Sequence, residues 1–198
     1  MLTLIHAPQS RSSRIVWLLE ELGAPCDIRY VTIPRMDGSG GPDADNPHPD
    51  KKVPALLHDG ALVTESVAIV QYLTDLHPKA GLAPLAGDPK RGAYLTWLAW
   101  YAGVVEPVIT HEFLKIDHPN LERTFRGRKE VDGRILDALG RHAFLVGDDF
   151  SAVDVVFASL GHWFRSALPA GDRVDEYVKA CIDRPAFRRA MERDKPRA

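Results

Sequence analysis

The sequence predicts a two-part α/β plus all-α protein, in which a domain with the order β-α-β, loop, β-β-α precedes a helical domain. Short apolar or alternating runs, which are typical of strands, all lie before His77, and nothing beyond it alternates like a strand. Residues 78–88 have the proline and glycine density of a linker. We therefore expect a first domain at residues 1–77, a linker at 78–88 and an all-helical domain at 89–198.

The first elements are predicted to be a strand, a helix and a strand. Residues 2–6 (LTLIH) form a short apolar run that ends at a turn rich in proline and serine. In residues 12–23, apolar side chains recur at helical spacing, serines offer an N-cap and Gly23 offers a stop. Residues 26–33 then alternate like a second strand.

A long loop leads to a hairpin and a second helix. Residues 34–50 are crowded with Gly, Pro, Asn and Asp, which predicts an exposed, mobile loop of the kind that often borders a binding site. The hairpin turns at Asp59-Gly60, and residues 65–78 carry an apolar helical stripe. Pro54 opens the hairpin's first strand, although proline supplies no backbone donor to a sheet.

The second domain is predicted to consist of helices alone. Apolar side chains follow helical spacing in residues 89–109, 120–142 and 150–164, and one or two shorter helices are expected between residues 174 and 193. Pro107 should bend or end the first of these helices. Ser151 and Asp154 form an aspartate variant of the capping box.

Composition argues against several classes of protein. The net charge is −2 with both signs interspersed, so neither a nucleic-acid footprint nor a polybasic membrane patch is indicated. Cys26 and Cys181 lie far apart, and the eight histidines show no zinc-ligand spacing, so no metal is expected. The apolar tract at the start is too short for a signal peptide or a membrane helix. We expect a soluble, cytoplasmic chain.

Three segments carry a resemblance to a known family. They are residues 6–23 (HAPQSRSSRIVWLLEELG), 51–73 (KKVPALLHDGALVTESVAIVQYL) and 150–160 (FSAVDVVFASL). In this order and spacing, and over nearly the whole chain, they resemble the cytosolic glutathione transferases. The resemblance implies a thioredoxin-like first domain, glutathione as the co-substrate, a small hydrophobic electrophile as its partner in the reaction, and a homodimer.

The hairpin segment would bind the peptide backbone and one end of glutathione. In the fold that the resemblance implies, Pro54 follows a cis peptide bond, so that the Val53 backbone can pair with a peptide as an added strand does. Ser66 opens a helix whose N–H groups and dipole favour a carboxylate, and Glu65 can accept the ammonium group of the γ-glutamyl end. The alternative is that Thr64, Glu65 and Ser66 only cap the helix.

The glycine carboxylate at the other end of glutathione needs a positive partner. Lys52 directly precedes the Val53-Pro54 pair, and the resemblance supports that position. Lys51 is its rival, His48 could also contribute, and a solvated lysine without a ligand is the alternative for both lysines.

Catalysis would consist of stabilising the glutathione thiolate, because an unperturbed thiol has a pKa of about 8.5 and the thiolate is the nucleophile. Ser10 matches the position of the catalytic serine in theta-like and related classes, and its hydroxyl would donate to the sulfur anion. The start of the helix adds a favourable potential. Ser12 and Ser13 stay open as alternatives, and each serine could instead cap the helix.

The turn indicates a serine-type, theta-like or nu-like member of the family. It has no tyrosine at the position that the tyrosine-type classes use and no cysteine like that of the beta or omega classes. Glutathionylation of the protein and dehydroascorbate-type reduction are therefore disfavoured. The Ser-Ser-Cys run of the zeta class is also missing, which disfavours maleylacetoacetate isomerase without excluding it.

The electrophile is expected to lie against the first long helix of the second domain. Trp100, Tyr101 and Val104, with Phe113 or Phe164, are the candidate lining residues. Aromatic residues at helical spacing belong more often to a core. The main prediction is a glutathione transferase; the alternatives are a non-catalytic binding or regulatory protein, or an isomerase or peroxidase that uses glutathione on the same fold.

Overall fold

The computed structural model describes residues 1–196, except for the side chain of Glu122. Its contacts divide the chain into two compact units. Unit 1 contains residues 1–80 together with residues 184–196, and unit 2 contains residues 81–183.

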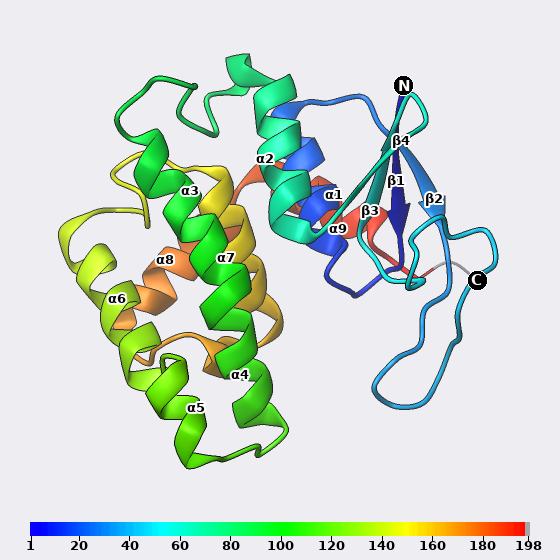
Figure 1. Ribbon diagram of the computed structural model, residues 1–198. Helices are drawn as coiled ribbons and strands as arrows, with labels where there is room; N and C mark the ends of the chain where they lie inside the picture. Colours follow the sequence, from blue (N-terminus) through cyan, green and yellow to red (C-terminus); the bar gives the residue numbers. More distant parts are fainter. Residues whose placement is uncertain (197–198) are drawn as a thin grey trace. The chain divides into compact units, whose positions relative to one another are not determined.

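Unit 1 is built on a four-stranded mixed sheet with the order β2-β1-β3-β4 (Figure 1). β1 pairs with β2 in parallel, and the β1–β3 and β3–β4 pairs are antiparallel. Its elements are β1 (Leu2–His6), α1 (Ser13–Leu22), β2 (Asp27–Tyr30), β3 (Ala55–His58), β4 (Ala61–Thr64), α2 (Ser66–Leu76), the short 3₁₀ helix η1 (Pro78–Ala80) and α9 (Pro185–Arg193). The predicted order β-α-β, loop, β-β-α is confirmed.

β1 lies inside the sheet and is buried on both faces. Leu4 and Ile5 have no exposed surface, although they point to opposite sides of the strand. Ile5 packs with Val31 and Ala55. The continuous apolar run LTLIH reflects this burial, since a strand covered on both faces does not alternate.

Helix α9 packs on α1 within unit 1. The rings of Trp17 and Phe187 meet edge to face with centroids 4.9 Å apart. Arg184 donates two hydrogen bonds, of 2.7 and 2.8 Å, to the Glu21 carboxylate, and Arg193 lies 2.7 Å from Glu20. The sequence-based division assigned residues 184–198 to the helical domain, whereas these contacts group α9 with the sheet. The difference arises because the apolar stripe of a helix does not say which surface covers it.

Unit 2 contains helices and, among its described residues, no strand. The helices are α3 (Arg91–Trp100), the π-helical segment η2 (Tyr101–Val105), α4 (Glu106–Phe113), α5 (Pro119–Thr124), α6 (Arg128–Arg141), α7 (Ala152–Trp163), the 3₁₀ helix η3 (Arg165–Ala167) and α8 (Asp172–Ile182). The helix predicted for residues 120–142 is divided in two, because the backbone is extended at Phe125 and Gly127. The all-helical character of this part of the chain is confirmed.

Pro107 does not end the first long helix. The helix passes from α3 through the wider η2 turn into α4, and Pro107 occupies the first turn of α4. Proline is tolerated there because the N–H groups of the first turn of α4 have no acceptor within α4 itself. The wider turn also shifts the helical register after Trp100.

The capping box of α7 is present. The backbone N–H and the hydroxyl of Ser151 both donate to Asp154 Oδ2, at 2.8 and 2.9 Å. Asp154 also accepts from the Leu145 N–H and the Tyr177 hydroxyl. This buried carboxylate therefore joins the start of α7 to α8 and to the segment before α7.

Candidate active site

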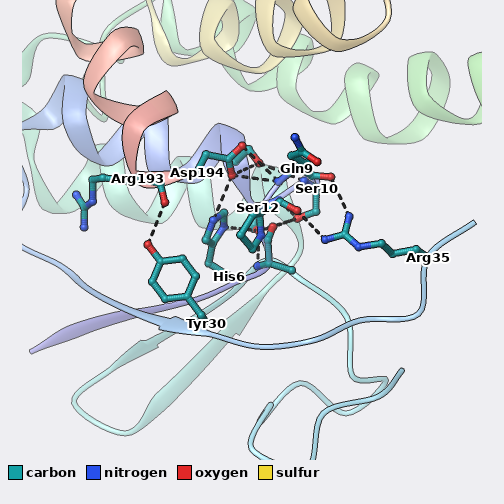
Figure 2. Close-up of polar contacts among 11 residues, drawn as sticks. His6, Gln9, Ser10, Ser12, Tyr30, Arg35, Arg193 and Asp194 are labelled. Carbon is teal, nitrogen blue, oxygen red and sulfur yellow. Dashed lines mark hydrogen bonds and ion pairs between the residues drawn. The ribbon is translucent and has the colours of Figure 1, made fainter. Parts of the chain in front are cut away.

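The turn between β1 and α1 is held by contacts from two other segments (Figure 2). Asp194, at the end of α9, accepts a hydrogen bond from the Gln9 N–H at 3.2 Å. Arg35, from the loop after β2, donates to the Pro8 carbonyl at 2.8 Å. Gln9 itself has φ of 55°, in the left-handed region that non-glycine residues seldom adopt. The position of this turn is thus determined by residues distant in the sequence.

Ser10 is half-buried at this turn. Its Oγ accepts a hydrogen bond from the Ser12 N–H at 3.1 Å and donates to the Ala7 carbonyl at 2.7 Å. It also lies 2.8 Å from Ser12 Oγ. The hydroxyl hydrogen of Ser10 therefore has two internal acceptors within reach, and a bound ligand would have to replace them.

Ser12 and Ser13 are buried, with 0% and 1% of their surface exposed. Ser12 Oγ lies 2.7 Å from His6 Nδ1 and accepts from the Ala7 N–H at 3.2 Å. Ser13 donates to Asp194 at 2.6 Å. Because both hydroxyls are enclosed and engaged, Ser10 is the serine of this run that a ligand can approach.

The register of the sheet gathers the candidate binding residues of unit 1. Ile5 near the end of β1 pairs with Ala55 at the start of β3, and Ala55 pairs with Thr64 at the end of β4. These three strand ends therefore lie together at one side of the sheet, which we call the ligand edge. This edge runs across the ends of the strands and not along an outer strand. The segments that extend from this edge contain Ser10, Val53–Pro54 and Glu65–Ser66.

The Val53–Pro54 peptide bond is cis, which confirms the prediction made from the sequence. Pro54 is buried, and the partly buried Val53 packs against the cluster of Ile5, Val31 and Ala55. Among the hydrogen bonds of residues 1–196, none uses the backbone N–H or carbonyl of Val53. A peptide ligand could therefore pair with this residue as an added strand.

The two lysines before Val53 have different surroundings. Lys51 donates from Nζ to the Asn46 carbonyl at 2.6 Å, which ties it to its own loop. Lys52 is exposed, and its ammonium group has no partner in the described chain. His48 is buried and accepts the Asp50 N–H on Nδ1. Lys52 is therefore better placed than Lys51 to bind the carboxylate of a ligand.

The junction between β4 and α2 leaves helix donors available. Glu65 is exposed with φ of 67° and ψ of 125°, an unusual backbone conformation that such residues adopt mainly at binding sites and switches. In the part of the chain that the structure describes, no side chain caps α2. The first N–H groups of a helix have no partner within it, so the half-buried Ser66 and its neighbours can receive an anion.

The candidate lining residues of unit 2 are not equally exposed. Trp100 is 6% exposed and packs on Phe157, with the guanidinium of Arg134 4.6 Å from its ring centroid. Tyr101 is 1% exposed and donates to Glu106 at 2.9 Å. Both residues therefore pack as core residues. This burial disfavours the roles that the sequence analysis gave to Trp100 and Tyr101.

Val104 lines a cavity of about 740 Å³ inside unit 2. The apolar part of its wall includes Val104, Pro107, Val108, Ile116, Leu121 and Phe125. Phe113 and Phe164 lie elsewhere, in edge-to-face contact with centroids 5.6 Å apart, and both are about half exposed. In the described residues, no group of three or more His, Cys, Asp or Glu side chains is arranged to hold a metal ion.

Two residues of this site were not predicted from the sequence. His6 is the last residue of the apolar strand β1 and has no exposed surface. The signal for it in the sequence was a histidine within an apolar run, where a buried polar side chain needs a partner. Asp194 gives no such signal, because it lies 181 positions after Ser13 and meets it only in the folded chain.

The chain resembles known proteins in sequence and in fold. The family model described as "Glutathione S-transferase, N-terminal domain" matches residues 4–81. Glutathione S-transferase 3 of Schizosaccharomyces pombe is 41% identical over 216 aligned positions, which cover 98% of this chain and 88% of the yeast protein. The chain belongs to the glutathione S-transferase family.

Solved structures agree with this assignment of the glutathione transferase fold. A glutathione transferase from Methylococcus capsulatus has a TM-score of 0.78 and 26% identity, covering 98% of each chain. A sphingomonad glutathione S-transferase, solved in complex with glutathione, has a TM-score of 0.78 and 24% identity, covering 97% of this chain and 98% of its own. The predicted family, fold and enzyme class are therefore confirmed, whereas the roles of single residues are proposals.

No helix of the described chain combines the length and the apolar character that crossing a membrane requires.

Proposed function

We propose that this glutathione transferase binds glutathione along one edge of the sheet of unit 1 and joins its thiolate sulfur to a small hydrophobic electrophile. The observation that carries the proposal is the shared edge. The half-buried hydroxyl of Ser10, the unpaired backbone of Val53 and the uncapped start of α2 are brought there by the register of three strands. The proposal agrees with the names of the relatives and with the glutathione complex of the sphingomonad protein.

Each portion of glutathione has a complementary group on this edge. The backbone of Val53 pairs with the cysteinyl residue of glutathione as an added strand does. Ser66 and the N–H groups of the first turn of α2 bind the γ-glutamyl carboxylate, and Glu65 attracts the neighbouring ammonium group. Lys52 faces the glycine carboxylate.

Ser10 stabilises the thiolate. When the ligand is bound, the hydroxyl hydrogen of Ser10 turns from the Ala7 carbonyl to the sulfur anion. Lowering a pKa by one unit requires about 1.4 kcal/mol of preference for the charged form, and one hydrogen bond to a charged group contributes roughly 1.5–3 kcal/mol. One hydroxyl is therefore sufficient for a depression of about one to two units. The thiolate then attacks the electrophile, a carbon–sulfur bond forms and the leaving group departs.

The electrophile, the subclass and the assembly are further proposals. Val104 is the residue of the second unit that we retain for the electrophile site, since Trp100 and Tyr101 are buried. The exposed pair Phe113 and Phe164 offers additional apolar surface. A serine-type, theta-like or nu-like member and a homodimer are the subclass and the assembly that the resemblance implies.

Calorimetry of glutathione binding tests the site. Ser66→Ala and Glu65→Ala each remove a group that contacts a charge of the ligand, so we expect each to weaken affinity by about ten- to a hundredfold. Glu176→Ala changes an exposed carboxylate on α8 and should bind like the unaltered protein.

Unchanged affinity in both site variants would contradict the residue assignment. Absence of glutathione binding by the unaltered protein would instead favour a non-catalytic member of the family. Conjugation of glutathione to an activated aryl chloride, followed by absorbance, distinguishes a transferase from a protein that only binds.

A further inference from the structure

A chain of hydrogen-bonding groups runs inward from Ser10 to the end of α9 (Figure 2). Ser10 Oγ lies 2.8 Å from Ser12 Oγ, and Ser12 Oγ lies 2.7 Å from His6 Nδ1. On the far side of the imidazole, Nε2 lies 3.2 Å from Asp194 Oδ1, at an angle outside regular hydrogen-bond geometry. Ser12 and His6 have no exposed surface, and Asp194 is 3% exposed. A hydroxyl at the ligand edge is thus connected to a buried imidazole and carboxylate.

Asp194 determines which ring nitrogen of neutral His6 carries the hydrogen. An Nε2 lone pair facing the carboxylate oxygen would be repelled, whereas an Nε2–H is attracted. We therefore assign the hydrogen to Nε2, which leaves the Nδ1 lone pair facing Ser12. The Ser12 hydroxyl has two acceptors within reach, His6 Nδ1 at 2.7 Å and the Ala7 carbonyl at 3.2 Å. Because a hydroxyl has one hydrogen and His6 is the nearer acceptor, Ser12 donates to His6 and meets Ser10 as an acceptor. Ser10 can donate to the Ala7 carbonyl at 2.7 Å or to Ser12 Oγ at 2.8 Å. When its hydroxyl turns to Ser12, the donors of this chain all point inward, from Ser10 to Ser12 to His6.

We propose that this chain takes up the thiol proton of bound glutathione, an inference that rests on the function proposed for Ser10. The thiol proton passes to Ser10 Oγ, the hydroxyl hydrogen of Ser10 passes to Ser12, and that of Ser12 passes to His6 Nδ1. Each hydroxyl ends with one hydrogen, while His6 becomes an imidazolium and the sulfur a thiolate. One S–H bond is broken and one N–H bond is formed, with no change of oxidation state.

After the transfer, the chain stabilises both new charges. Its donors now point outward, from His6 to Ser12, from Ser12 to Ser10 and from Ser10 to the sulfur anion, and such chains strengthen cooperatively. The positive imidazolium faces the Asp194 carboxylate across 3.2 Å in a buried site, where opposite charges attract more strongly than in water.

The other polar groups near His6 are engaged elsewhere. Tyr30 of β2 meets the imidazole in a T-shaped contact at 5.4 Å, and its hydroxyl donates to the Arg193 carbonyl. The cations of the adjoining segments include Arg11 in the turn and Arg14, which is buried in the first turn of α1. Arg35 donates to the carbonyls of the turn, and Arg193 pairs with Glu20. Asp194 is therefore the carboxylate that faces the ring in this part of unit 1.

Burial also distinguishes the chain from a nucleophilic serine triad. Ser12, His6 and Asp194 are the groups of such a triad, but a hydroxyl without exposed surface cannot attack a ligand. Ser10 is the member that touches the sulfur. His6, Ser12 and Asp194 act through it and are positioning residues.

Counting protons released by the unaltered protein tests the proposal. Glutathione and S-methylglutathione, whose thiol is blocked, are bound in weakly buffered solution with a pH indicator, and the difference in proton release belongs to the thiol. Thiolate formation is followed in parallel by ultraviolet absorbance. We expect thiolate to form with far less than one proton released per thiolate. Release of one proton per thiolate would overturn the proposal even if Ser10 still stabilises the sulfur anion.

Variants of the chain supply a second readout. In His6→Gln and Ser12→Ala, thiolate should form only at higher pH and should release its proton to the solution, while affinity for S-methylglutathione is unchanged. Ser39→Ala, an exposed hydroxyl in the loop, should match the unaltered protein. Equal proton counts in all variants would overturn the proposal. If a variant at a buried position does not fold, the proton count of the unaltered protein is still a complete test. Absence of any thiolate in the unaltered protein would instead contradict the function proposed for Ser10.

Discussion

At the scale of single residues, the environment of the turn separates three serines that look alike in the sequence. Ser10, Ser12 and Ser13 each precede or open a helix, where any of them could serve as a cap. In the folded chain Ser12 is enclosed by His6 and the Ala7 backbone, and Ser13 is bonded to Asp194. Only a hydroxyl that retains exposed surface can exchange an internal acceptor for a ligand, which selects Ser10.

Replacing Ser10 by alanine should raise the pKa of the bound thiol and slow conjugation at neutral pH. Loss of one hydrogen bond to a charged sulfur, at roughly 1.5–3 kcal/mol, corresponds to about a ten- to hundredfold slower reaction. Glutathione affinity should be largely retained, because both ends of the ligand are still bound. Thiolate absorbance titrated against pH, together with steady-state rates, measures both effects.

Ser10→Thr retains a hydroxyl and serves as the matched variant. If thiolate absorbance titrates identically in Ser10→Ala and the unaltered protein, the helix end or a backbone N–H activates the thiol instead.

At the scale of elements, helices in each unit are joined by buried or half-buried charges. Burial works against ionisation of Glu20 on α1, but hydrogen bonds from Arg189 and Arg193 of α9 outweigh it and lower the pKa of this carboxyl. A folded-state pKa below the ordinary value of 4.5 means that the pairing stabilises the folded state above that pH. This contribution is lost as the pH falls through the lowered pKa.

Asp154 is the corresponding group in unit 2, and its replacement by alanine should destabilise the protein. Burial raises the pKa of Asp154, while four donated hydrogen bonds oppose the shift. Removing the carboxylate would leave these buried donors unpaired and α7 without its cap. We expect the free energy of unfolding to fall by about 3 kcal/mol, measured by urea denaturation.

Tyr177→Phe removes one of the four donors and leaves the cap intact, so it should cost about 1 kcal/mol. Equal losses of stability in the two variants would show that the hydrogen bond from Tyr177 of α8, rather than the cap, is the main contribution of this carboxylate.

At the scale of the whole molecule, the end of the chain belongs to the unit in which the chain begins. α9 covers α1 through Trp17 and Phe187, and Asp194 binds the turn that carries Ser10. The two units are therefore not two consecutive stretches of sequence. The region that performs the proposed chemistry requires residues from both ends of the chain.

Truncation after Asp183 should loosen unit 1 selectively. Removal of α9 exposes Trp17 and leaves Glu20 and Glu21 without their arginine partners, so amide hydrogen exchange should rise in α1 and β1. Exchange in α7, within unit 2, should stay unchanged. Mass spectrometry of peptic fragments measures both regions.

Truncation after Lys195 retains α9 and Asp194 and is the matched control. Equal exchange in α1 for both truncated proteins would contradict the role of α9 as a cover for this helix.

The sequence by itself determined the family, the order of elements and several local features. Hydrophobic periodicity specified the strands and helices, because a buried face must repeat with the period of its element. Glu65 and Ser66 could be proposed as ligand contacts because they follow a hairpin and open a helix. The cis bond at Pro54 was expected from the resemblance and is confirmed. It could be expected because the bond and the motif that indicates it lie in the same short segment.

Only the tertiary structure decided which hydroxyl is accessible, where α9 packs and what lies behind Ser10. Trp100 and Tyr101 are buried against a partner from another helix, Phe157 of α7. The contact of His6 with Asp194 joins residues at opposite ends of the chain. Local patterns record the period of a buried face but not its partner, and contacts between distant residues form only when those faces pack together.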